Sequence, residues 1–190
     1  MGDTVSIIGY HKEPDKNTSD ILRNNRIKVS QDKEYKDTYM WLGAGIYFWH
    51  TFEDAIWWNN NRYHYGAVFS ALLSCDSDKY VNLDLQEEMT RIAEYSDRAI
   101  ADLKAKKAEI DFDNIDKVRS VLCTMYKYEK GIKLMRYSFP SRMETNSAGF
   151  YAPVRGRTQY CATDMESVSN IQLVARTEWD TIIGVYYGYV

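Results

Sequence analysis

The sequence predicts an α+β domain, because segments with strand character gather near both ends of the chain and helical patterns fill the middle. The end segments are short and rich in β-branched and aromatic residues, which is typical of strands. Residues 85–128 instead repeat apolar residues at helical spacing. A length of 190 residues suits one domain spanning residues 1–190, with a helical segment inside it.

Composition narrows the class of protein. A hydrophobic content of 45% and a charged content of 27% are typical of globular proteins, and a net charge of −3 gives no overall attraction for nucleic acid. Three scattered cysteines without C-x-x-C spacing argue against a disulfide framework or a zinc site and favour a reducing compartment. No apolar run is long enough to span a membrane, so we expect a cytoplasmic protein without membrane contact or bound metal.

The first part of the chain is predicted to alternate strands with short helices. Polar residues at 17–20 are cap candidates for a short helix, and Thr51 with the acids after it is a start signal for a longer one. In order, we expect a strand over 4–8, a helix over 21–25, a strand over 26–30, a surface loop over 31–39, a strand over 46–49, and a helix over 52–63 with Phe52, Ala55 and Ile56 on one face.

The second part is predicted to contain two long helices and further strands. A continuous apolar run over 66–75 indicates a fully buried strand. After it we expect a strand over 79–84, a helix over 85–107, and a second helix over 115–128 with Asp113 and Asn114 as its cap region. A mixed region over 131–151, a basic turn over 152–157, and strands over 158–162, 169–174 and 182–187 follow. The two helices complete the core or form an insertion that partners contact.

The densest motif places Gly43 and Gly45 directly before the strand over 46–49. Glycine at such positions permits a positive φ or allows a ligand to approach the backbone closely. This turn leads into a strand and not into a helix, so a phosphate-binding dinucleotide fold is not expected. Tyr47 lies in the strand, and Trp58 follows it by eleven residues.

These residues resemble the ADP-ribosyltransferase superfamily, in the branch similar to poly(ADP-ribose) polymerases and diphtheria toxin. The resemblance rests on His11 after a first strand, the G-x-G-I-Y-F strand around Tyr47, and the polar Gln159 on a late strand. It covers the first sixty or so residues and the segment from about 149 to 174. It implies a split, mostly antiparallel pair of sheets with surrounding helices and a helical insertion.

The resemblance also implies a role for each candidate residue. His11 would hydrogen-bond a hydroxyl of NAD, while Tyr47 and Trp58 would stack on the planar nicotinamide ring, with Trp57 as the competing aromatic. The backbone of Lys12, which stands where the family has glycine, would hold the nicotinamide amide beside Gly45. The remaining implied residues are Gln159 as the third catalytic residue and Arg155 and Arg157 as contacts to the acceptor.

The third position departs from the usual acid of this branch. Breaking the bond between nicotinamide and ribose develops positive charge on the ribose, which a carboxylate stabilises better than an amide. Three readings follow: Gln159 positions the acceptor for transfer of a single ADP-ribose, or Glu144 or Glu166 is the true third residue, or the site binds NAD without chemistry.

Two classes of function therefore remain. The first is an NAD-dependent mono-ADP-ribosyltransferase acting on a protein or a nucleic acid, with NAD as co-substrate and NAD glycohydrolysis as a variant. The small size fits a toxin or defence effector, and an inhibitory partner protein is compatible with that role. The second class is an inactive module that binds ADP-ribose, NAD or a partner protein.

Overall fold

The computed structural model describes residues 2–30, 40–60, 65–139, 143–145, 151–153 and 156–178. In chain order, its helices and strands are β1 (Thr4–Pro14), α1 (Asp15–Asn24), β2 (Ile46–Trp49), α2 (Phe52–Asn60), β3 (Tyr65–Asp76), the short η1 (Ser77–Lys79), β4 (Tyr80–Asn82), α3 (Gln86–Ala105), α4 (Ile115–Lys130), β5 (Leu134–Phe139), β6 (Met143–Thr145), β7 (Tyr151–Pro153), β8 (Arg157–Ala162), the short η2 (Met165–Ser167) and β9 (Val168–Glu178).

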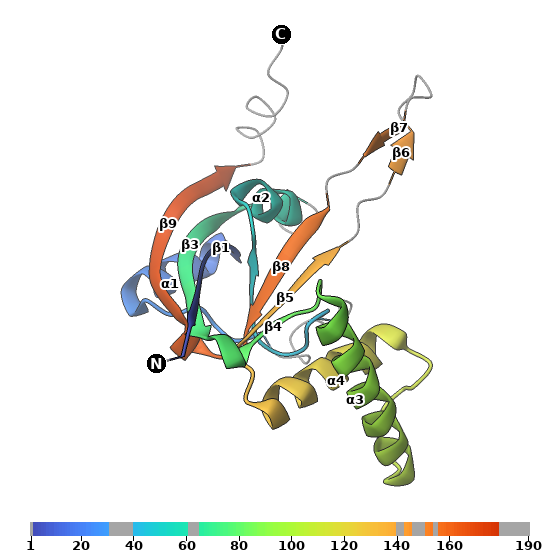
Figure 1. Ribbon diagram of the computed structural model, residues 1–190. Helices are drawn as coiled ribbons and strands as arrows, with labels where there is room; N and C mark the ends of the chain where they lie inside the picture. Colours follow the sequence, from blue (N-terminus) through green and yellow to red (C-terminus); the bar gives the residue numbers. More distant parts are fainter. Residues whose placement is uncertain are drawn as a thin grey trace.

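Seven strands form one mixed sheet in the order β4-β5-β8-β2-β1-β3-β9, and β6 pairs separately with β7. Only the β4–β5 pair of this sheet is parallel among the described strands. The sheet curves strongly, and α3 and α4, which lie between β4 and β5 in the chain, stand beside its β4–β5 end (Figure 1). The α+β class expected from the sequence is confirmed, and the sheet is mostly antiparallel as expected. The expected split into a pair of sheets is wrong, because β1 and β2 pair and join all seven strands in one sheet.

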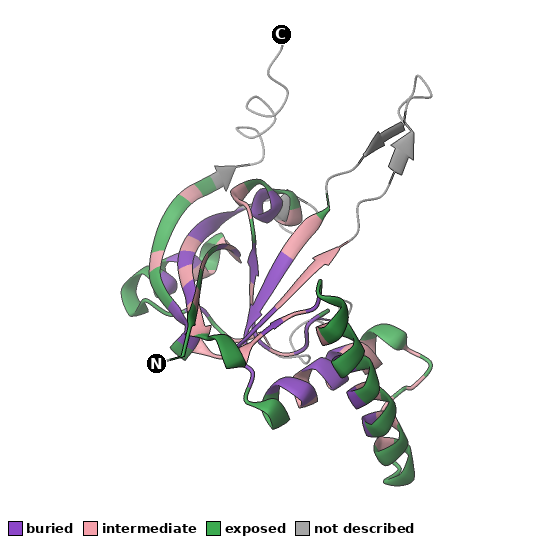
Figure 2. Cartoon of the chain, in the orientation of Figure 1, coloured by how far each residue is buried: buried purple, intermediate pink, exposed green. Residues whose placement is uncertain are grey.

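Successive side chains of each strand face opposite sides of the sheet, and each side has its own core. One side packs Phe48, Phe69 and Tyr160 against Ile21 of α1. On the other side, α2 covers the β1–β3 end, and α3 and α4 cover the β4–β5 end. The outer face of α3 is exposed while the central strands are largely buried, as Figure 2 shows.

Most predicted elements are confirmed, and so are two of their start signals. The hydroxyl of Thr51 accepts a hydrogen bond from Asp54 N at 3.2 Å at the start of α2. The side chain of Asn114 accepts one from Lys117 N at 3.0 Å at the start of α4. Strand β2 has the expected bounds. Among the described residues, no helix is both long and apolar enough to span a membrane.

Two expectations about elements are wrong, and the structure resolves one region for which no element was predicted. The first helix begins at Asp15, so the expected cap residues at 17–20 lie inside it. Residues 26–30 form no strand; Ser30 alone makes an isolated bridge, to Gly45. The region over 131–151, read as mixed, contains β5, which pairs along its whole length with β8. The segments 31–39 and 182–187 lie outside the described residues.

Candidate functional site

The glycine turn before β2 is shaped by close packing. Gly43 has a φ of 75°, and a Cβ built there would lie 2.4 Å from the hydroxyl oxygen of Thr124. A Cβ on Gly45 would lie 2.4 Å from the Sγ of Cys161 on β8. Both glycines therefore allow α4 and β8 to approach the chain directly before Tyr47.

Two side chains of α4 fix the same turn. Thr124 accepts a hydrogen bond from Ala44 N at 2.9 Å. Lys127 is 1% exposed and donates to Ala44 O at 2.7 Å and to the Sγ of Cys161 at 3.0 Å. The sequence analysis did not single out Lys127. Its signal was a lysine one residue after Tyr126, within the apolar stripe of a predicted helix.

Tyr47 has its hydroxyl fully engaged by this turn. The hydroxyl accepts a hydrogen bond from Leu42 N at 2.9 Å and donates one to Gly43 O at 2.8 Å. Burial, with Cys161 nearby, raises the pKa of Tyr47 well above its ordinary value. The hydroxyl is thus held neutral, and the ring is the part of this side chain that can stack on a ligand.

His11 contacts the backbone of the same residue. Its Nδ1 lies 2.8 Å from Tyr47 O, so the ring links β1 to β2 one residue beyond the Tyr10–Trp49 pair. Its Nε2 lies 3.5 Å from a carboxylate oxygen of Glu13. Burial alone would raise the pKa of Glu13, but His11, together with other neighbours, holds it below its ordinary value.

Lys12 is buried on β1, and its stem passes over β3. A Cβ on Gly66 would lie 2.7 Å from Lys12 Cε. Desolvation lowers the pKa of Lys12 to about 8, an effect that the charge of Asp15 partly offsets. The side chain that stands where the related family has glycine is thus accommodated inside the fold.

The strand register places the predicted residues on two sides of the sheet. Trp49 pairs with Gln159, so these two side chains share the side that α2, α3 and α4 cover. His11 pairs with Phe69, and its ring lies 5.5 Å from that of Phe48, on the side that α1 covers. The three strands that carry His11, Tyr47 and Gln159 are adjacent in the sheet, but the His11 ring and the Gln159 amide do not converge on one side.

Gln159 lies in a row of aromatic residues that crosses four strands. Paired positions run from Tyr137 on β5 to Gln159 on β8, then to Trp49 on β2 and Tyr10 on β1. Gln159 is 6% exposed, and its Oε1 is buried without a hydrogen-bond partner in the part of the chain that the structure describes. A buried amide oxygen without a donor is costly, which marks it as a group available to a ligand.

The predicted aromatic partner of Tyr47 packs elsewhere. The ring of Trp58 lies 5.5 Å from that of Trp49 and 6.3 Å from that of Trp57. Trp58 belongs to the α2 cluster, whereas Tyr47 packs against the α3–α4 cluster. The aromatics that the structure brings beside Gln159 are Trp49 and Tyr137, neither of which was predicted as a site residue.

Arg157 lies in β8, and its guanidinium is 3.6 Å from the centre of the Trp57 ring. Its Nε lies 3.5 Å from an oxygen of Asp54. Two residues before Gln159, it shares the same side of the sheet. Arg155, the other predicted acceptor contact, lies outside the described residues.

Glu166 and Glu144 were the alternatives to Gln159 as the third catalytic residue. Glu166 belongs to η2 beyond the far end of β8, and its carboxylate bonds Lys133 at 2.7 Å. Glu144 belongs to β6, where the structure describes the backbone alone. Within the described ranges, no group of three or more His, Cys, Asp or Glu side chains could hold a metal ion.

This arrangement combines planar aromatic surfaces, a buried amide oxygen and a stacked guanidinium on one side of the sheet. Such a set suits a ligand that has a flat ring and hydroxyl groups. The chain matches no protein-family model, no curated protein and no solved structure.

Proposed function

We propose that this chain is an NAD-dependent mono-ADP-ribosyltransferase that modifies a macromolecular acceptor, either a protein or a nucleic acid. The observation that carries the proposal is the buried Oε1 of Gln159, which has no hydrogen-bond partner among the described residues and lies on the strand next to that of Tyr47. The resemblance in sequence implies that the third catalytic residue lies on a late strand. Gln159 lies on such a strand, β8, which pairs with the strand of Tyr47.

The residues present fit NAD in their chemistry. NAD would supply the ADP-ribosyl group and nicotinamide as the leaving group. The rings of Tyr47 and Trp49 offer flat apolar surfaces to a planar ring, and the Gln159 amide offers an acceptor to a hydroxyl.

Gln159 would act by orienting a hydroxyl group. Its amide accepts and donates hydrogen bonds but carries no charge, so it stabilises positive charge on the ribose less than a carboxylate would. This difference favours transfer of one ADP-ribose to a bound acceptor. Arg157 lies on the same side, and an arginine fork suits a phosphate or carboxylate of that acceptor.

A binding module without turnover is the second candidate. Two observations favour it: an amide stands where this branch has an acid, and Trp58 packs on Trp49 and not against Tyr47. Such a module would hold NAD or ADP-ribose through the same aromatic surfaces. Turnover of NAD separates the two candidates.

The test is incubation of the purified protein with adenylate-labelled NAD and a cell extract, followed by separation of protein, RNA and DNA. We expect label in one fraction. Replacement of Gln159 by Ala should lower the transfer rate by about 100-fold or more, since one group aimed at the transition state contributes about that much. Gln159→Glu should raise the rate of nicotinamide release, because a carboxylate stabilises the ribose cation better.

Controls separate catalysis from folding. Gln172→Ala on the exposed part of β9 is a matched change and should leave the rate unaltered. Tyr47→Phe keeps the stacking ring and should retain NAD binding, whereas Tyr47→Ala should lose it. NAD binding without label or free nicotinamide would replace the transferase by the binding module. The absence of both NAD binding and NAD turnover would overturn the transferase and the binding module alike.

A further inference from the structure

A second feature lies between the two long helices and the β4–β5 end of the sheet. A cavity of about 410 Å³ opens there, within the range of about 300–1,000 Å³ typical of small-molecule sites. Its walls are almost entirely apolar. They include Leu42, Leu83, Ile92, Val118, Leu122 and Tyr137. None of His11, Tyr47, Trp58 and Gln159 is among the residues that line it, although Tyr137, which pairs with Gln159, is. The cavity therefore adjoins the site of the proposed transfer reaction without containing its candidate residues.

Among the described residues that line the wall, Arg119 is the one cation. Its guanidinium lies 3.4 Å from the centre of the Trp41 ring, and a terminal nitrogen pairs with Asp116. Its Nε is buried and has no hydrogen-bond partner among the described residues. A buried N–H group without an acceptor is destabilising, so an acceptor entering the cavity would remove a penalty that the free protein carries.

The charges around the opening indicate what kind of acceptor fits. Asp116 already compensates the charge of Arg119, and Asp111 and Asp113 line an adjacent depression that shares Ile115 with the cavity. These carboxylates repel an anion. A neutral molecule avoids the repulsion and still satisfies the Arg119 N–H.

The rim is apolar as well, which favours entry of an apolar molecule from water. Trp41 is 39% exposed, Met89 36% and Ile115 75%, although all three line the cavity. The ring of Trp41 lies nearly parallel to that of Tyr137, with 6.3 Å between the centres and 9° between the planes. These parallel rings offer a flat surface to a planar ligand.

We propose that the cavity between α3, α4 and β5 binds a neutral, apolar, planar small molecule whose carbonyl-type oxygen accepts a hydrogen bond from Arg119. The site requires neither NAD nor turnover. Its occupant would hold α3 against α4 and the sheet, because all three elements contribute walls.

The test is titration of the full-length protein with Nile red, a neutral planar dye with a ring carbonyl, monitored by its blue-shifted fluorescence. We expect saturable binding with a stoichiometry of one and a rise in Tm. The sulfonated dye 1-anilinonaphthalene-8-sulfonate should bind at least tenfold more weakly, because of the acidic rim. Equal or tighter binding of the sulfonate would overturn the neutral class of ligand.

Variants locate the dye. Ala93 lines the cavity at an exposed position of α3, so Ala93→Phe should block entry while leaving the core intact. The matched change Ala101→Phe, at an exposed position of the same helix outside the cavity wall, should bind the dye normally. Arg119→Met should weaken binding about fivefold to tenfold. Undiminished binding of the dye by Ala93→Phe would overturn its location in this cavity. Undiminished binding by Arg119→Met would overturn the hydrogen bond to Arg119.

Discussion

At the scale of single residues, Gly43 shows how tertiary packing can require a glycine. Two glycines of the described chain, Gly43 and Gly131, have positive φ angles, of 75° and 64°. A Cβ on Gly43 would lie 2.6 Å from Thr124 N, whereas a Cβ on Gly131 would meet nothing within 4 Å. The first glycine therefore satisfies a conformational and a steric requirement, and the second a conformational requirement alone.

This contrast gives the first prediction of stability. Gly43→Ala should lower the free energy of unfolding by roughly 3 kcal/mol or more, because left-handed strain adds to a clash with the backbone of α4. Gly131→Ala should cost about 1 kcal/mol, from strain alone. Urea denaturation of both variants measures the difference. Equal losses would show that α4 moves aside and that the contact with Gly43 does not constrain the turn.

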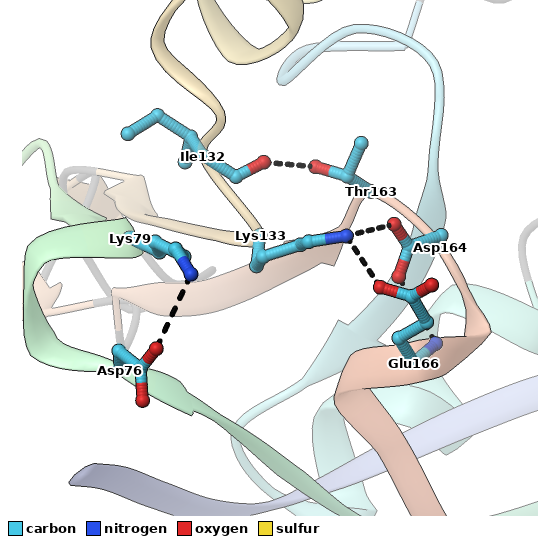
Figure 3. A network of polar contacts seen from close by, with 7 residues as sticks. All are labelled: Asp76, Lys79, Ile132, Lys133, Thr163, Asp164 and Glu166. Carbon is cyan, nitrogen blue, oxygen red and sulfur yellow. Dashed lines mark hydrogen bonds and ion pairs between the residues drawn. The ribbon is translucent and has the colours of Figure 1, made fainter.

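At the scale of elements, Lys133 joins the start of β5 to the turn after β8. Its Nζ bonds Asp164 and Glu166, each at 2.7 Å, and these hydrogen bonds raise the pKa of Lys133 above its ordinary value. Figure 3 shows both contacts beside the Lys79–Asp76 pair, which lies within one turn of the chain. Lys133 thus joins segments that are distant in sequence, whereas Lys79 bonds a residue three positions away.

Lys133→Met should therefore lower the free energy of unfolding by about 1 kcal/mol, the sum of two partly exposed pairs. Lys79→Met, the matched change, should have almost no effect. Thermal denaturation at low and high salt measures both, and the loss for Lys133→Met should shrink at about 1 M salt because the charges are screened. A loss that does not depend on salt would assign the effect to packing of the lysine stem.

The same scale explains which elements the sequence predicted. Helix α4 and strand β2 carry strong local signals: a cap at Asn114 with apolar residues at helical spacing, and a run of β-branched and aromatic residues. Residues 26–30 carry two apolar residues, Ile27 and Val29, and form no ladder with any strand that the structure describes. Strand β5 has a weak pattern but pairs on both edges, with β4 and β8. Partners that are distant in sequence decided both cases.

At the scale of the whole molecule, burial of Lys12 couples stability to pH. Its pKa is about 8 in the folded chain, against an ordinary value of 10.5, chiefly because of desolvation. Between these values the unfolded chain binds more protons than the folded chain, so the contribution of Lys12 to stability rises with pH across this window. Burial raises the pKa of Tyr80 to about 12, so its contribution falls only above about pH 10.

The free energy of unfolding of the wild type, relative to that of Lys12→Met, should rise by about 1 kcal/mol between pH 7.5 and 10, after allowance for solvent screening. Chemical denaturation of both proteins across this range measures the difference, and subtraction removes every other titrating group. If the difference in the free energy of unfolding between the two proteins does not change with pH, Lys12 keeps its charge when buried.

The sequence by itself determined the α+β class, the strand around Tyr47, the helices α2, α3 and α4 and the set of candidate residues, because these depend on local periodicity, caps and residue type. Only the tertiary structure decided the strand order that makes the strands of His11, Tyr47 and Gln159 neighbours. It also decided that Trp49 and Tyr137 flank Gln159 and that Trp58 packs away from Tyr47. The physical reason is that a side chain's face and neighbours depend on strand register, which joins residues more than a hundred positions apart.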